Sequence, residues 1–134
     1  MEAEKIKWEK VERIVSTTFP EEYEQVSRRQ IEYIEERIHE GQSPYVQDQE
    51  AGGMHVDFGA AINVVAELML ATELIVAWYD FVKPAKEEVT YENFYRTMEQ
   101  VPQIRGFLTA LLTQELLRTL ERFFDQITDV LMHL

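Results

Sequence analysis

The sequence predicts an all-α fold, a compact bundle of about five helices, three of them long, around a central apolar helix at residues 57–83. Three observations predict it. Apolar residues recur at helical spacing along most of the chain, and no alternating pattern of useful length indicates a strand. A length of 134 residues with 46% hydrophobic content is enough for one buried core. No internal repeat divides the chain, so residues 1–134 are expected to form a single helical domain.

The first two helices are predicted at residues 3–16 and 20–40. Thr18 followed by Glu21 is a capping-box pattern for the second helix, and Gly41 is placed as its C-terminal stop. Apolar residues at spacings of three to five give each helix a buried face: Ile6, Val11, Ile14 and Val15 in the first, and Tyr23, Val26, Ile31, Ile34 and Ile38 in the second.

Residues 41–56 are predicted to form the one long loop. Segments of this length without a pattern are uncommon inside a compact domain, and they are usually either functional or mobile. The sequence leaves these two alternatives open. Tyr45 and Val46 are expected to attach the middle of the loop to the core.

The central helix is predicted at residues 57–83, with Asp57 as its N-cap and Pro84 after its end. Apolar side chains occupy nearly every angular position around it, which indicates burial on all sides. This apolar surface is larger than the other predicted helices would cover comfortably. Self-association, most simply as a dimer, is therefore expected.

Two further helices are predicted at residues 91–100 and 102–132. Thr90 is a good N-cap for the shorter one, and Pro102 suits the first turn of the longer one. The longer helix has a broad apolar face opposite a polar stripe, and Gly106 is the expected position of a kink.

The net charge and its distribution indicate which classes of binding partner are favoured. The chain carries 25 acidic and 13 basic residues, a net charge of −12, spread evenly along its length. This charge disfavours direct binding to nucleic acid or to an anionic membrane. It indicates either a well-solvated surface or a protein partner with a basic face. The absence of cysteine and of a signal-peptide pattern favours a cytoplasmic protein, and the acidic residues within 58–82 argue against a membrane span.

One pair of residues resembles half of a metal site. Glu36 and His39 form an E-x-x-H pair on one helical face, the spacing that di-iron bundles use, and Glu67 could face inward from the central helix. A second E-x-x-H pair and further glutamates are missing. Exposed ion pairing is therefore the simpler interpretation of Glu36 and His39, and no metal or other cofactor is predicted.

The few polar residues of the central helix fall on two lines. Asn63 and Glu67 lie close together around the axis, as do Glu73 and Asp80. A buried carboxylate needs a partner, so each line is expected to meet solvent, a tyrosine hydroxyl or an arginine, or else to line a ligand pocket. The candidate arginines are Arg96, Arg105 and Arg118.

Aromatic residues cluster near the end of the central helix and on the last helix. They are candidates for core packing or for a protein interface, where aromatic side chains are enriched. The interface candidates are Trp78, Tyr79, Phe81, Phe94, Tyr95, Phe123 and Phe124.

No nucleophile elbow or phosphate-binding loop occurs in the sequence, so no catalytic residue is predicted. Three functional hypotheses follow. The first is a non-enzymatic protein-interaction domain, self-associating and bound to a protein partner. The second is an acidic inhibitor or immunity-type protein that masks a basic site, such as that of a nuclease. The third is a small-ligand or metal-binding bundle using Asn63, Glu67 and His39.

Overall fold

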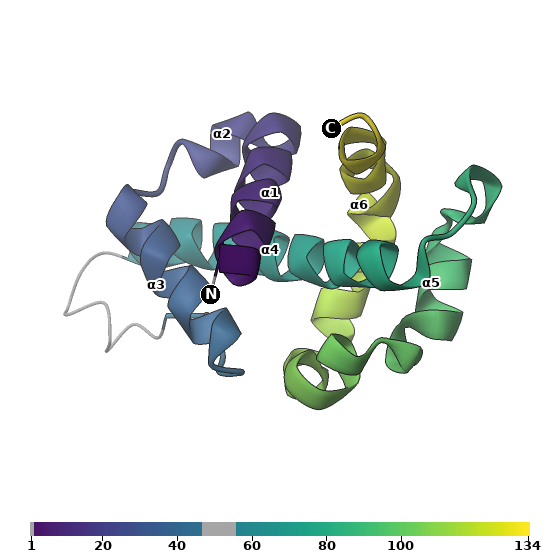
Figure 1. The fold of residues 1–134 in the computed structure, drawn as a ribbon. Helices are drawn as coiled ribbons and strands as arrows, with labels where there is room; N and C mark the ends of the chain where they lie inside the picture. Colours follow the sequence, from purple (N-terminus) through teal and green to yellow (C-terminus); the bar gives the residue numbers. More distant parts are fainter. Residues whose placement is uncertain (1, 47–55) are drawn as a thin grey trace.

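The computed structural model describes residues 2–46 and 56–134, with side chains from Lys7 to Val46 and from Ala61 to Leu134 except that of Phe107. These residues form helices and no strand, which confirms the predicted all-α fold. The helix α4 (Val56–Val82) runs through the whole molecule, and α1 (Glu2–Thr18) and α6 (Gln114–Met132) cross it (Figure 1). These two helices also contact each other. The short α2 (Pro20–Tyr23) and α3 (Arg28–His39) pack against α4 from one end, and α5 (Tyr91–Thr97) packs against α6 near the other.

The central helix was predicted at residues 57–83, and α4 matches this within a residue at each end. Lys83 has a φ of 51°, in the left-handed region, and it directly precedes Pro84. A residue before proline is disfavoured in the right-handed helical region, so the chain leaves the helix there. Asp57 lies inside the first turn of α4, since the helix begins at Val56.

A single chain buries the middle of α4. From Val65 to Trp78 every side chain is buried except that of Glu67, which is half-buried. The stretch Ala61–Val82 is long and apolar enough to cross a membrane, but 78% of its most apolar window is buried inside the fold, as in the core helix of a soluble protein. The described helices of one chain therefore cover more of α4 than the sequence led us to expect. Self-association itself stays a prediction.

The helix predicted at residues 20–40 is two helices. α2 ends at Tyr23 and α3 begins at Arg28, because Ser27 forms its own capping box with Gln30. The Ser27 Oγ accepts from the Gln30 backbone N–H at 3.2 Å, and the Gln30 side chain accepts from the Ser27 N–H at 2.7 Å. The predicted cap at Thr18 is wrong, since Thr18 belongs to the last turn of α1. The predicted stop at Gly41 is confirmed by its φ of 71°.

The helix predicted at residues 102–132 is also divided. A π-helical turn, η3 (Ile104–Leu108), and a 3₁₀ turn, η4 (Thr109–Leu111), precede α6. The Thr113 Oγ1 accepts from the Leu116 backbone N–H at 3.0 Å, so a new helix starts there rather than continuing from Pro102. The helix predicted at residues 91–100 consists of α5 followed directly by the 3₁₀ turn η2 (Met98–Gln100). The predicted cap at Thr90 is confirmed, since its hydroxyl accepts from the Asn93 backbone N–H.

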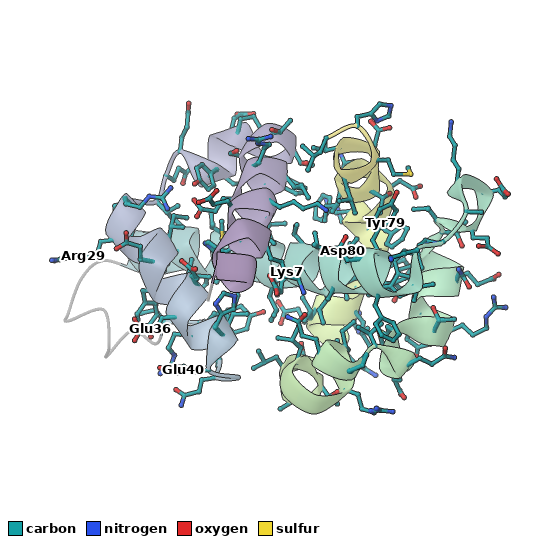
Figure 2. All side chains as sticks on the ribbon, viewed as in Figure 1. Lys7, Arg29, Glu36, Glu40, Tyr79 and Asp80 are labelled. Carbon is teal, nitrogen blue, oxygen red and sulfur yellow. The ribbon has the colours of Figure 1, made fainter. Side chains whose placement is uncertain are left out.

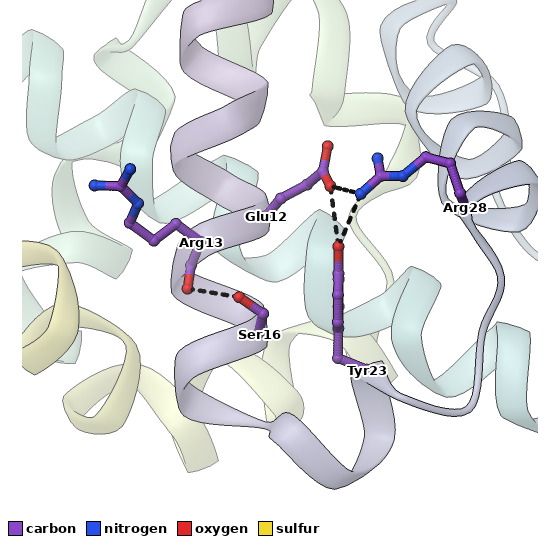
Figure 3. A network of polar contacts seen from close by, with 5 residues as sticks. All are labelled: Glu12, Arg13, Ser16, Tyr23 and Arg28. Carbon is purple, nitrogen blue, oxygen red and sulfur yellow. Dashed lines mark hydrogen bonds and ion pairs between the residues drawn. The ribbon is translucent and has the colours of Figure 1, made fainter.

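A polar contact joins α1 to the end of α2 and the start of α3. The Glu12 Oε1 accepts from the Tyr23 hydroxyl at 3.0 Å and pairs with the Arg28 guanidinium at 2.7 Å (Figure 3). Farther along α1, the Ser16 hydroxyl donates to the Arg13 carbonyl oxygen. Glu12 thus contacts a residue on each side of the break between α2 and α3 that the sequence pattern missed.

Candidate functional site

An open groove of about 570 Å³ lies on the described surface. It lies between the start of α2, the first half of α4 and the first half of α6. Its charged lining consists of three carboxylates and one arginine: Glu22, Glu67, Glu115 and Arg122. Neutral polar side chains come from Tyr45, Asn63, Thr113 and Thr119, and the apolar floor is formed by Phe19, Val64, Leu68 and Phe123. The volume is within the usual range for binding sites. We call this feature the acidic groove.

Glu67 occupies the middle of the acidic groove. Its Oε1 accepts from the Tyr45 hydroxyl at 3.1 Å, and its Oε2 accepts from the Thr119 hydroxyl. Among the side chains described from Lys7 to Val46 and from Ala61 onward, no lysine, arginine or histidine nitrogen lies within 4.0 Å of this carboxylate. Two hydroxyl groups thus hold this half-buried carboxylate, and none of the described side chains supplies a cation to it.

Asn63 attaches the chain before α4 to the rim of the groove. Its Oδ1 accepts from the Val46 backbone N–H at 2.7 Å, and its Nδ2 donates to the Val46 carbonyl at 3.1 Å. Together with the Tyr45 contact, these bonds confirm that Tyr45 and Val46 attach this part of the predicted 41–56 loop to the core. Residues 47–55 of that loop lie outside the described residues.

Aromatic rings form part of the groove floor. Phe19 and Phe123 meet edge to face with their centroids 5.0 Å apart. The Arg122 guanidinium lies 5.0 Å above the Phe123 ring, so the groove's one arginine is directed onto an aromatic face. Val64 is 49% exposed, a large value for an aliphatic side chain.

The structure separates the three metal candidates. Glu36 is exposed on the outer face of α3, alongside Arg29 and Glu40 (Figure 2). His39 is half-buried and meets the Trp8 ring edge to face at 5.4 Å, while Glu67 lies in the acidic groove. Within the described part of the chain, no three histidine or acidic side chains come close enough to hold a metal ion. Asn63 and Glu67 share a site, but His39 does not belong to it.

A second polar centre lies inside the core at Glu73. Its side chain has no exposed surface. Its Oε2 accepts from the Gln103 amide at 2.9 Å, while its Oε1 has no hydrogen-bond partner among the described residues. The Lys7 ammonium donates to the same Gln103 side chain. Burial raises the pKa of the Glu73 carboxyl above its ordinary value, and the nearby Lys7 and His39 act in the opposite direction.

The partners predicted for these carboxylates were partly right. Glu67 meets a tyrosine hydroxyl, as expected for one of the two lines. Glu73 meets an amide, with a lysine behind it, instead of Arg96, Arg105 or Arg118. The fourth residue of the two lines, Asp80, is half-exposed and pairs with Lys10 at 3.4 Å (Figure 2 shows its position on α4).

The aromatic interface candidates fall into two groups. Trp78, Phe94 and Phe124 are fully buried and pack on one another with centroid distances of 5.5 to 6.0 Å, so they belong to the core of the single chain. The others reach the surface: Phe81 and Tyr95 are 55% and 54% exposed, and Tyr79 and Phe123 are half-buried. Only the second group can form an interface on the folded chain.

Several groove residues were not singled out from the sequence. Glu22, Glu115 and Thr119 come from two helices whose ends were misplaced, and Glu115 and Thr119 are spaced four apart on one face of α6. That spacing was visible, but nothing in the sequence indicated that this face lies opposite Glu67. Gln103, which bridges Lys7 and Glu73, had no sequence signal at all.

Comparison with known proteins gives no relative for this chain. No protein-family model, no curated protein and no solved structure matches it.

Proposed function

We propose that this chain is a non-enzymatic protein-interaction domain whose acidic groove binds a basic segment of a partner protein. The observation that carries the proposal is Glu67, a half-buried carboxylate in the middle of the groove that has hydroxyl partners and meets no cation among the described side chains. A lysine or arginine side chain would supply the missing charge and could form a charge-assisted hydrogen bond with either oxygen.

The rest of the groove supports a cationic partner. Glu22 and Glu115 add two carboxylates to the lining, and its arginine, Arg122, packs on a ring. The exposed Val64 and the half-buried Phe123 provide an apolar surface for the aliphatic stems of lysine or arginine. The net charge of −12 would also accelerate association with a basic protein.

The same chemistry accommodates the hypothesis of an inhibitor that masks a basic site. A nuclease or nucleic-acid-binding surface is rich in lysine and arginine, and the acidic groove would compete with its nucleic acid. We treat this as one class of basic partner.

The test measures binding of a short peptide of alternating lysine and leucine, labelled with a fluorophore, by fluorescence anisotropy at several salt concentrations. The same peptide with glutamate in place of lysine is the control ligand. We expect the lysine peptide to bind, to weaken as salt rises, and to lose about tenfold in affinity with Glu67→Gln. Glu36→Gln is the matched control variant, because it removes the same charge from the exposed face of α3.

Equal loss with Glu67→Gln and Glu36→Gln would mean that the net charge alone attracts the peptide, and the groove would not be the site. Absence of binding to the lysine peptide at low salt would overturn the proposal. Binding of the glutamate peptide with the same affinity would do so as well.

Self-association remains part of the proposed function. It now depends on the exposed Phe81 and Tyr95 rather than on α4. Sedimentation velocity at two protein concentrations tests it, and a strict monomer at both would remove it. A cytoplasmic location is also proposed, on the ground that a chain without cysteine needs no oxidising compartment.

A further inference from the structure

The segment Ser43–Val46, which we call the strap, lies along α3 and α4 at the edge of the acidic groove. The Arg37 Nε donates to the Ser43 carbonyl at 2.9 Å, and Asn63 makes two hydrogen bonds with the Val46 backbone. Pro44 is buried between these contacts. The strap is thus held at both ends, and Tyr45 between them is directed to Glu67.

The Tyr45 hydroxyl lies next to the Glu67 carboxylate, at a position where a positively charged group would be stabilised. It donates to the Glu67 Oε1, and burial together with the charges of Glu67 and Glu115 raises the pKa of the phenol above its ordinary value. The negative potential that opposes ionisation of the phenol would stabilise an ammonium or guanidinium at the same point. A neutral donor therefore occupies one oxygen of the carboxylate that the groove offers to a basic partner.

We infer that the strap is an intramolecular competitor: a partner's lysine or arginine takes the Glu67 Oε1 from the Tyr45 hydroxyl, and the strap moves away from the groove when the partner binds. This inference rests on the proposed function of the acidic groove. A charged donor can displace the phenol because a charge-assisted hydrogen bond is about twice as strong as a neutral one.

The competition has a measurable consequence. If the partner binds only the state in which Tyr45 no longer donates to Glu67, the population of that state limits the apparent affinity. Tyr45→Phe keeps the ring and removes the hydroxyl, so it should raise the affinity for the lysine–leucine peptide roughly three- to tenfold. Tyr79→Phe, a half-buried tyrosine of α4 outside the groove lining, should leave the affinity unchanged.

The exchange rate of the Val46 amide gives a second readout that does not depend on affinity. This N–H is bonded to the Asn63 Oδ1 at 2.7 Å, so departure of the strap should expose it. We expect the lysine–leucine peptide to accelerate hydrogen exchange at Val46 in the wild-type protein. Slower or unchanged exchange at saturating peptide would show that the strap stays in place, which overturns the inference.

The outcomes separate the two proposals. If the wild-type protein binds the peptide and Tyr45→Phe binds it equally or more weakly, Tyr45 supports the groove instead of competing for it. The strap inference then fails while the proposed function stands. If neither protein binds the peptide, the proposed function fails and the strap inference falls with it. Tighter binding by Tyr45→Phe, with faster exchange at Val46, supports both.

Discussion

Glu73→Gln tests whether the buried carboxylate at the centre of α4 destabilises the fold. Glu73 has no exposed surface, and its Oε1 has no hydrogen-bond partner in the described part of the chain. Its carboxyl pKa lies above the ordinary 4.5 because burial outweighs the nearby Lys7 and His39. A raised pKa means that the folded state binds the proton more tightly than the unfolded state does. The folded protein should therefore lose stability as pH rises from 4.5 to the pKa of the folded state, and the cost should be fully present above that value.

The size of the effect follows from the environment of Glu73. Each unit by which the pKa is raised corresponds to about 1.4 kcal/mol. A buried polar group without a partner costs about 1–3 kcal/mol, and more when it is charged. Glutamine keeps the acceptor for Gln103 and cannot ionise, so any cost of its own unpartnered amide is the same at every pH. We expect the variant to gain about 1–3 kcal/mol relative to wild type between acid and neutral pH.

The assay is urea unfolding followed by far-ultraviolet circular dichroism, at neutral pH and at a pH below 4.5 at which the protein remains folded. Glu36→Gln, at an exposed position, is the control and should show almost no change in the difference between the two pH values. If Glu73→Gln instead loses stability relative to wild type as pH rises, the Lys7–Gln103–Glu73 contact stabilises the charged form. The view that burial dominates would then be wrong.

Two further predictions concern the fold. Leu74→Ala should reduce the free energy of unfolding by about 2–5 kcal/mol because Leu74 is fully buried in α4, whereas Leu134→Ala, at a position that is 52% exposed, should change it by less than about 0.5 kcal/mol; equal effects in urea unfolding would contradict the central place of α4. Thr113→Ala should cost about 1 kcal/mol by removing the cap of α6, and the exposed Thr17→Ala on α1 is its control. A continuous helix from Pro102 to Met132 would make Thr113→Ala neutral or stabilising.

The sequence was most informative where a strong local pattern agreed with the tertiary structure. The continuous apolar run and Pro84 defined α4 within a residue at each end, and Thr90 correctly marked the start of α5. The errors came at two places where the helical spacing of apolar residues continues from one helix into the next, so that two separate elements were predicted as a single helix. Ser27 and Thr113 each cap a new helix, yet the apolar pattern continues across both positions. A cap is a short signal, and periodicity over a longer window outweighed it.

Self-association was expected because α4 carries more apolar surface than its predicted neighbours would cover comfortably. The sequence shows how much apolar surface a helix carries, but not how closely its neighbours approach. Small residues let helices approach closely, and Ala66, Ala71 and Ala77 are all buried on α4. With α1 and α6 crossing the helix and touching each other, a single chain covers it. The composition of the helix alone could not show whether other helices of the same chain or a second copy of the chain cover it.

The two carboxylates of α4 show where prediction of the site from sequence ends. Glu67 and Glu73 are six residues apart, so their side chains point about 120° away from each other around the helix axis. The sequence could place them on separate lines and could require a partner for each. It could not tell which line lies under α1 and which faces the space between α2 and α6, because that depends on the helix breaks at Ser27 and Thr113. Glu67 therefore lies half-buried in the acidic groove, while Glu73, on the same helix, is fully buried and its carboxyl pKa is raised by that burial.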